Sequence, residues 1–220
     1  MARQVRLGSL GERLTDDLRL LIVSGRIPVG ERLVEDSLAS EYDVSRGPVR
    51  DALRTLGQEG LIAGRRQGYV VRGLTADDVS ELYTVRRALE GLAIHILAER
   101  PAESVDWTLT DAALAAIHEA AEAGDEHAFS QRDLDFHTTL YEATGNTRLS
   151  GLWEVIRPTF AAMFEITSSH NLDLHASWNE HTQMRDLIRS GDDDAAQAYL
   201  ARHLAGSQAR MTEALALIGT

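Results

Sequence analysis

The chain has 220 residues, of which 44% are apolar and 25% are charged, as in an ordinary folded protein of one or two domains. It contains no cysteine, so disulfides and thiolate metal sites are excluded, and any metal must be bound through nitrogen and oxygen. No apolar run approaches the roughly 18 residues of a membrane span, and the N-terminus lacks the apolar segment of a signal peptide. We therefore expect a cytoplasmic protein with no membrane partner.

The net charge of −12 is unevenly distributed along the chain. Residues 1–72 hold 12 arginines and 10 acidic residues, whereas residues 73–220 hold 10 arginines and 24 acidic residues. The first segment is therefore nearly neutral, and it can approach nucleic acid although the chain as a whole is acidic.

A stripe of apolar residues with helical spacing runs from Leu10 to Ser24 and stops at a turn rich in glycine and proline. A short helix is predicted from about Glu35 to Tyr42, and a second helix opens after Ser45, which stands in the N-cap position. Two short strands, 61–62 and 69–71, follow that second helix. This order predicts a winged helix-turn-helix, in which the second helix enters the major groove of DNA and the strands form a wing.

The predicted recognition helix turns polar side chains away from its apolar stripe. Arg46 and Arg50 are four residues apart and so share one face, where either can bind guanine or phosphate. The tip between the two strands adds Arg65 and Arg66 on a backbone that contains glycine. The candidate DNA-binding residues are Arg32, Ser45, Arg46, Gly47, Arg50, Arg54, Gln67 and Gly68.

From residue 74 onward the sequence shows only helical periodicity, interrupted by short separators that contain glycine or proline. Helices are expected over 76–99, 108–122, 125–143, 147–166, 172–189 and 193–217. Consecutive helices joined by short loops predict an antiparallel bundle. The fold is therefore expected to be mainly α, with a winged helix-turn-helix over residues 1–73 and an all-α bundle over residues 74–220.

The segment PVGERLVEDSLASEYDVSRGPVRDALRTLGQEGLI resembles the N-terminal signature of the GntR family of bacterial transcription regulators. Positions in register with that signature are Gly30, Leu33, Glu35, Leu38, Ala39, Val44–Arg46, Pro48–Arg50, Ala52, Leu53, Leu56 and Glu59–Leu61. The resemblance implies operator contacts from Arg46 and Arg50, supported by Ser45 and Gly47, with wing contacts near Gln67 and Gly68. Where many members carry a basic residue in the first helix of the motif, this chain has Asp36, for which Arg32 is the nearest replacement.

Most of residues 75–210 resemble the FCD effector domain of the FadR subgroup. The matching motifs are Leu82–Glu90, Asp133–His137 with Gly145–Asn146, Glu180–His181 and Arg202–Leu204. In this domain type, matching positions bind a divalent metal, and here they imply Asp133, His137, His181 and His203 as ligands.

The chemistry of these four residues agrees with that implication. Asp133 and His137 have i, i+4 spacing, so both can reach one ion, and a bundle can bring His181 and His203 to the same space. Three imidazoles and one carboxylate suit zinc, with nickel, manganese or iron as alternatives. Arg86 is the candidate for binding the carboxylate of a small organic acid, although a surface or interhelical salt bridge would also explain it. The remaining histidines are interpreted as non-ligands: His95, His118, His127, His170 and His175.

These features favour a homodimeric, metabolite-responsive transcription regulator, most simply a repressor, that binds double-stranded operator DNA with two-fold symmetry. One alternative is a metal-dependent hydrolase-like enzyme that uses the histidine and aspartate centre. However, the sequence has no HExxH motif, no nucleophile elbow and no phosphate-binding loop. A second alternative is a metal-only sensor without an organic ligand.

Overall fold

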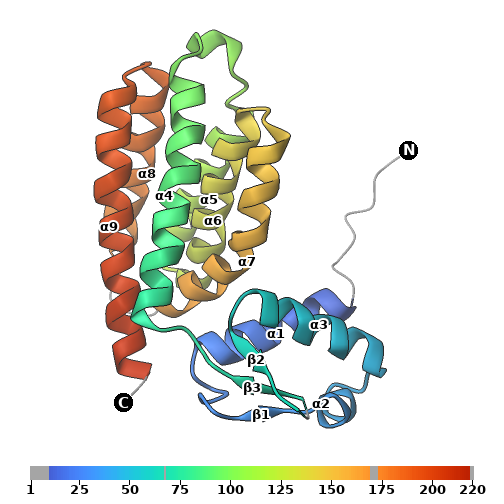
Figure 1. Ribbon diagram of the computed structural model, residues 1–220. Coiled ribbons are helices and arrows are strands. Elements are labelled where there is room, and N and C mark those ends of the chain that lie inside the picture. Colours follow the sequence, from blue (N-terminus) through green and yellow to red (C-terminus); the bar gives the residue numbers. More distant parts are fainter. Residues whose placement is uncertain (1–9, 67, 169–172, 219–220) are drawn as a thin grey trace. The chain divides into compact units, whose positions relative to one another are not determined.

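The computed structural model describes residues 10–66, 68–168 and 173–218. Contacts between Cα atoms divide the chain into one unit that runs through Thr75 and a second unit, Ala76–Leu217 (Figure 1). The first is a winged helix-turn-helix and the second is a helical bundle, so the predicted fold class is confirmed.

The first unit contains helices α1 (Leu10–Val23), α2 (Glu35–Glu41) and α3 (Arg46–Gln58) and strands β1 (Arg32–Leu33), β2 (Ile62–Gly64) and β3 (Tyr69–Val71). The strands form an antiparallel sheet in the order β1-β3-β2. Only β2 and β3 were expected from the sequence. β1 is two residues long, too short for an alternating pattern, and it exists because Arg32 and Leu33 pair with Val70 and Tyr69.

The core of the first unit leaves one face of α3 exposed. Helix α3 packs on α1 through apolar positions that are almost completely buried, and Val49, Leu53 and Leu56 show no exposed surface. Since these residues recur at helical spacing, the positions on the opposite side of α3 face solvent. The apolar pattern therefore fixes which arginines remain available for a partner.

Gly68 has a structural reason to be glycine in addition to its predicted place on the wing. Its φ angle is +84°, and a Cβ atom there would lie 2.6 Å from the carbonyl oxygen of Leu33. A larger residue would therefore push the wing turn away from β1.

The second unit consists of α4 (Ala76–Ala98), α5 (Thr108–Ala123), α6 (Glu126–Ala143), α7 (Thr147–Ser168), α8 (Leu174–Arg189) and α9 (Asp193–Ile218), with a 3-10 turn, η1 (Ala102–Ser104). Each helix begins and ends within two residues of its expected limits. None of the described helices is long and apolar enough to cross a membrane.

Helix α6 lies at the centre of the bundle, because it contacts α4, α5, α7 and α8. Gly124 ends α5 in the left-handed conformation, and the Asp125 side chain caps α6 by accepting a 2.9 Å hydrogen bond from the backbone N–H of Ala128. Stacked rings of Tyr141 and Trp153, with centroids 4.8 Å apart, join α6 to α7. Residues on the inner face of α6 can therefore meet side chains from several helices.

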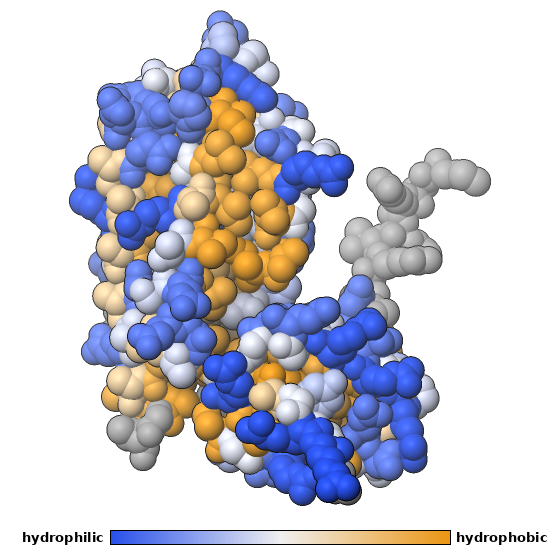
Figure 2. All heavy atoms as spheres, in the orientation of Figure 1, coloured by the Kyte–Doolittle hydropathy of each residue, from blue (hydrophilic) through white to orange (hydrophobic). Residues whose placement is uncertain are grey.

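One outer face of the bundle is apolar, over α4 and α7 (Figure 2). Val85 and Leu92 of α4 are each 46% exposed, and Leu152 and Val155 of α7 are 55% and 67% exposed. Neighbouring apolar side chains on two packed helices form a continuous patch, which is unlike the scattered apolar residues of an ordinary surface.

Candidate functional sites

The exposed face of α3 carries the arginines that the sequence predicts for DNA binding. Arg46, Arg50 and Arg54 are one turn apart and all three are exposed. Ser45 is the N-cap residue by backbone conformation, but its hydroxyl makes no capping hydrogen bond, which corrects the expected side-chain cap. The first N–H groups of α3 are thus left without that acceptor and can bind an anion such as phosphate.

The three arginines differ in their partners. Nε of Arg46 lies 2.7 Å from Oδ1 of Asp36, and Nη2 of Arg54 lies 3.4 Å from Oδ1 of Asp51. Arg50 forms no ion pair with any residue in the described part of the chain. The pair of Asp36 with Arg46 was not expected, because it depends on the angle between α2 and α3.

The wing places a second basic group beside the sheet. Arg32, Arg65 and Arg66 line an open hollow with Gly30 and Val70. Gly47 is half-buried in the first turn of α3. Gln67, another predicted contact, lies outside the described residues. No observation tests the predicted DNA-binding residues directly, so they remain a prediction.

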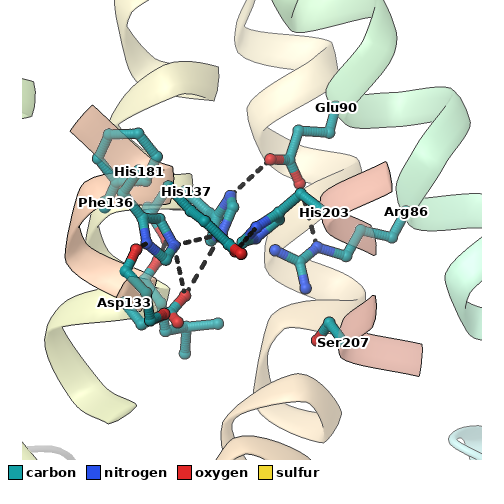
Figure 3. A network of polar contacts seen from close by, with 12 residues as sticks. Arg86, Glu90, Asp133, Phe136, His137, His181, His203 and Ser207 are labelled. Atoms are coloured by element: carbon teal, nitrogen blue, oxygen red, sulfur yellow. Dashed lines mark hydrogen bonds and ion pairs between the residues drawn. The ribbon is translucent and has the colours of Figure 1, made fainter. Parts of the chain in front are cut away.

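The second unit brings three predicted metal ligands together at its centre (Figure 3). One nitrogen from each of His137, His181 and His203 lies within 4.8 Å of the others. His137 and His181 are completely buried and His203 is 8% exposed. These residues come from α6, α8 and α9, and they are the group of this kind found among the described residues.

The surroundings of each ring fix the nitrogen that can bind a metal. His137 Nδ1 donates to Glu90 Oε1 at 2.5 Å, and His181 Nδ1 donates to the carbonyl oxygen of Ser177 at 2.7 Å. His203 Nδ1 donates to Glu180 Oε2 at 3.1 Å. Because all three partners only accept hydrogen bonds, each Nδ1 carries the proton in the neutral ring and each Nε2 keeps its lone pair. Carboxylates and carbonyls are the usual partners that orient metal-binding histidines.

Asp133 supplies an oxygen at the same place. Its Oδ1 lies 3.3 Å from Nε2 of His137 and 3.3 Å from Nε2 of His181, yet it accepts no hydrogen bond. A buried carboxylate oxygen without a donor is costly, so the position favours a bound cation. The donor set therefore fits a divalent metal.

The pKa values in the cluster reflect burial and mutual attraction. Burial raises the pKa of Asp133, but the nearby His181 and His137 outweigh this effect and hold it well below its usual range. Burial lowers the pKa of His181, but the attraction of Asp133 is stronger, so the pKa of His181 lies above its ordinary value. His203 has a pKa of about 4, because burial and the two neighbouring imidazoles outweigh the attraction of Glu180.

Arg86 is completely buried beside this cluster. Its Nε donates to Glu90 at 3.0 Å, whereas Nη1 and Nη2 make no hydrogen bond. The guanidinium carbon lies 5.0 Å and 5.2 Å from the ring centroids of Phe160 and Phe164. Arg86 does form an ion pair, but with Glu90 of its own helix and fully buried, so it is neither a surface nor an interhelical salt bridge. Its free Nη fork is suited to a carboxylate.

Two hollows reach the cluster from outside. One, of about 130 Å³, lies beside His203 and is lined by Glu180, Tyr199, Arg202, Gly206 and Arg210. The other, of about 20 Å³, borders Asp133 and is lined by residues that include Ser207 and Arg210. Arginines thus stand at the side from which an anion can enter.

Sequence reasoning missed Glu90 and left Glu180 without a role, although they accept hydrogen bonds from His137 and His203, two of the predicted metal ligands. Glu90 could have been noticed because it is four residues after Arg86, and Glu180 because it directly precedes His181. Both patterns are too common in helices to identify a partner of a histidine. The four described histidines that were interpreted as non-ligands are 43% to 63% exposed and pair with carboxylates instead: His95, His118, His127 and His175. His170 lies outside the described residues.

Comparison with known proteins gives two family matches. Residues 10–71 match the bacterial regulatory proteins of the gntR family, and residues 81–206 match the FCD domain. The gluconate operon transcriptional repressor of Bacillus subtilis (strain 168) is 32% identical over 84% of this chain and 75% of the relative. That of Bacillus licheniformis is 30% identical over 84% and 78%, respectively.

A solved structure of a GntR-type regulator from Rhodococcus sp. RHA1 has the same fold. It is 24% identical to this chain with a TM-score of 0.67, over 93% of this chain and 98% of its own. The relatives are transcription regulators and not enzymes, which argues against the hydrolase alternative.

Proposed function

This chain belongs to the GntR family of bacterial regulatory proteins and is a DNA-binding transcription regulator, and we propose that it is a metabolite-responsive repressor. Its helical unit binds a divalent metal ion and a small organic acid. Together these ligands change the affinity of the winged helix-turn-helix unit for operator DNA. One observation carries this proposal. Three imidazole nitrogens and the unbonded oxygen of Asp133 lie beside a buried Arg86 whose terminal nitrogens have no partner.

Asp133, His137, His181 and His203 are the proposed metal ligands. Zinc is the first candidate, because it is bound readily by imidazole and carboxylate, and nickel, manganese and iron are the alternatives. The bound metal would supply a positive charge that attracts the carboxylate of the effector. Glu90 and Glu180 accept hydrogen bonds from Nδ1 of His137 and His203, which leaves Nε2 of each ring available to a metal.

Arg86 is the proposed second anchor for the effector. Its two free Nη groups match the two oxygens of a carboxylate, and such a pair forms strong hydrogen bonds in a buried site. Both Bacillus relatives are named for the gluconate operon, so gluconate, a carboxylate with several hydroxyl groups, is the first compound to test.

The apolar patch on α4 and α7 supports a homodimer. A two-fold axis through this patch would bury Val85, Leu92, Leu152 and Val155 against the same residues of a second copy. Two copies then present two copies of the α3 face, and a near-palindromic operator follows from that symmetry.

The test uses the full-length protein and a duplex that it selects from a random library. Metal content is measured by elemental analysis, and DNA binding is measured by mobility shift with and without gluconate and related acids. Stoichiometric metal together with an acid that changes duplex affinity supports the proposal, because control requires different ligand affinity in the two states. Metal dependence with no response to any acid would favour the metal-only sensor. Metal-dependent ester or amide hydrolysis would favour the enzyme.

A further inference from the structure

The ion pair between α2 and α3 lies at the predicted DNA-reading face. Asp36 is in the first turn of α2, and Arg46 is the first residue of α3. Their side chains are 61% and 71% exposed, and Oδ1 of Asp36 lies 2.7 Å from Nε of Arg46. An exposed pair of this kind contributes little to stability, so its effect on the conformation of Arg46 is the more important consequence.

Asp36 contacts Nε of Arg46, and this determines which N–H groups of Arg46 remain free to bind DNA. A guanidinium has five N–H donors in a rigid fork, and the Nε side is occupied by the carboxylate. The Nη1 and Nη2 edge remains, and two parallel donors of this kind match the O6 and N7 acceptors of guanine. Because one side is already held, less side-chain entropy is lost when the other side binds.

The carboxylate of Asp36 also weakens the attraction of Arg46 to phosphate. Asp36 offsets the charge of Arg46, and non-specific affinity comes almost entirely from cations that neutralise phosphates. Arg50, one turn further along α3, has no such partner among the described residues and keeps its full charge. The two arginines therefore differ in their electrostatic surroundings, although their spacing makes them look equivalent.

We propose that Asp36 is a positioning residue that determines DNA specificity by holding Arg46 for a guanine in the major groove. This inference rests on the proposed DNA-reading face of α3. It predicts that loss of the carboxylate increases affinity for DNA of any sequence and decreases discrimination between sequences.

Asp36→Asn is the test variant, and Glu41→Gln is its matched control. Each change removes one negative charge from α2, but Glu41 is exposed and forms no ion pair with a described residue. Full-length protein is used throughout. The wild-type chain first selects a duplex from a random library, and fluorescence anisotropy then gives the Kd for that duplex and for a scrambled one.

Specificity is measured as the Kd for the scrambled duplex divided by the Kd for the selected duplex, so that a higher ratio means better discrimination. Asp36→Asn is expected to lower this ratio by about two- to five-fold, because an exposed ion pair can contribute no more than its own small free energy to the positioning of Arg46. Glu41→Gln should tighten binding to both duplexes equally and leave the ratio unchanged. Arg46→Gln should lower the ratio by itself, and adding Asp36→Asn to it should have no further effect on the ratio.

Two results would overturn the inference while the DNA-reading face stands. In the first, Asp36→Asn shifts both duplexes by the same factor as Glu41→Gln. In the second, Asp36→Asn lowers the ratio equally in the presence and absence of Arg46. If the wild-type chain selects no sequence at all, the DNA-reading face is itself wrong and the inference falls with it.

Discussion

The carboxylate of Glu90 accepts a 2.5 Å hydrogen bond from Nδ1 of His137, and both side chains are completely buried. The second oxygen of Glu90 accepts from Arg86. One acidic side chain on α4 thus connects the proposed metal site on α6 to the proposed effector anchor. Burial raises the pKa of Glu90, but the charges of His137 and Arg86 outweigh it and hold the value at about 2.

Glu90→Gln should weaken zinc binding by about 10- to 100-fold, the usual effect of losing the carboxylate that orients a ligand histidine. The amide keeps the size of the side chain but no longer stabilises the His137 orientation with a charge. The measurement is a competition between the full-length protein and a chelator. Glu81→Gln, an exposed change on the same helix, is the control. Equal zinc affinity in both variants would contradict the role of Glu90.

Zinc affinity should decrease as the pH falls. A metal binds the neutral imidazole, and the pKa of His181 is raised above its normal value of 6.5. Below that raised pKa, a proton must leave before the metal can bind, so affinity should fall by about ten-fold per pH unit for this one group. His203, with a pKa of about 4, stays neutral over the range and adds no dependence. Affinity that is constant between pH 5.5 and 7.5 would show that no ligand has a raised pKa.

Some of this site could be predicted from the sequence and some could not, for reasons that lie in the packing. Asp133 and His137 share one helix, so their spacing alone puts them on one face. His181 and His203 come from two other helices, and only the resemblance to a known domain linked them to that face. Glu90 was missed because periodicity cannot show that a carboxylate points inward at a histidine 47 residues away.

The fold was easier to predict than the contacts between its elements. The helices of the bundle have long apolar stripes, and their limits follow from glycines and caps that act locally. By contrast, β1 exists only because of its pairing with β3, and the contact of Asp36 with Arg46 depends on how two helices meet. Interactions of that kind have no signature within either segment.

Arg86→Gln should abolish most of the thermal stabilisation that a binding acid gives to metal-loaded protein. A lost charge-assisted pair corresponds to about ten-fold or more in effector Kd. Arg86→Lys keeps the charge without the fork and should show an intermediate effect. Arg87→Gln, an exposed change at the next position of α4, should respond as the wild-type chain does. Gluconate is the first probe, and a shift that survives in Arg86→Gln would remove this residue from the site.

Arg50→Ala should weaken binding to the selected duplex by about 1–3 kcal/mol if the contact is bidentate to a base. Affinity of the wild-type chain should also fall steeply with salt, since phosphate neutralisation releases counterions. Arg13→Ala removes an exposed charge from α1 of the same unit and should have a much smaller effect. Fluorescence anisotropy at several salt concentrations measures both quantities. Equal losses for the two variants would indicate general charge attraction in place of a specific contact.

Leu92→Glu or Val155→Glu should convert a dimer into monomers, because each places a charge in the middle of the apolar patch on α4 and α7. Light scattering coupled to size exclusion should then give a mass near that of one chain, 24.2 kDa. Leu109→Glu is the matched control, since Leu109 is 61% exposed on α5, outside the patch. That variant should remain dimeric. A wild-type chain that elutes as a monomer at micromolar concentration would exclude the two-fold arrangement, and dimers in both patch variants would assign the interface to another surface.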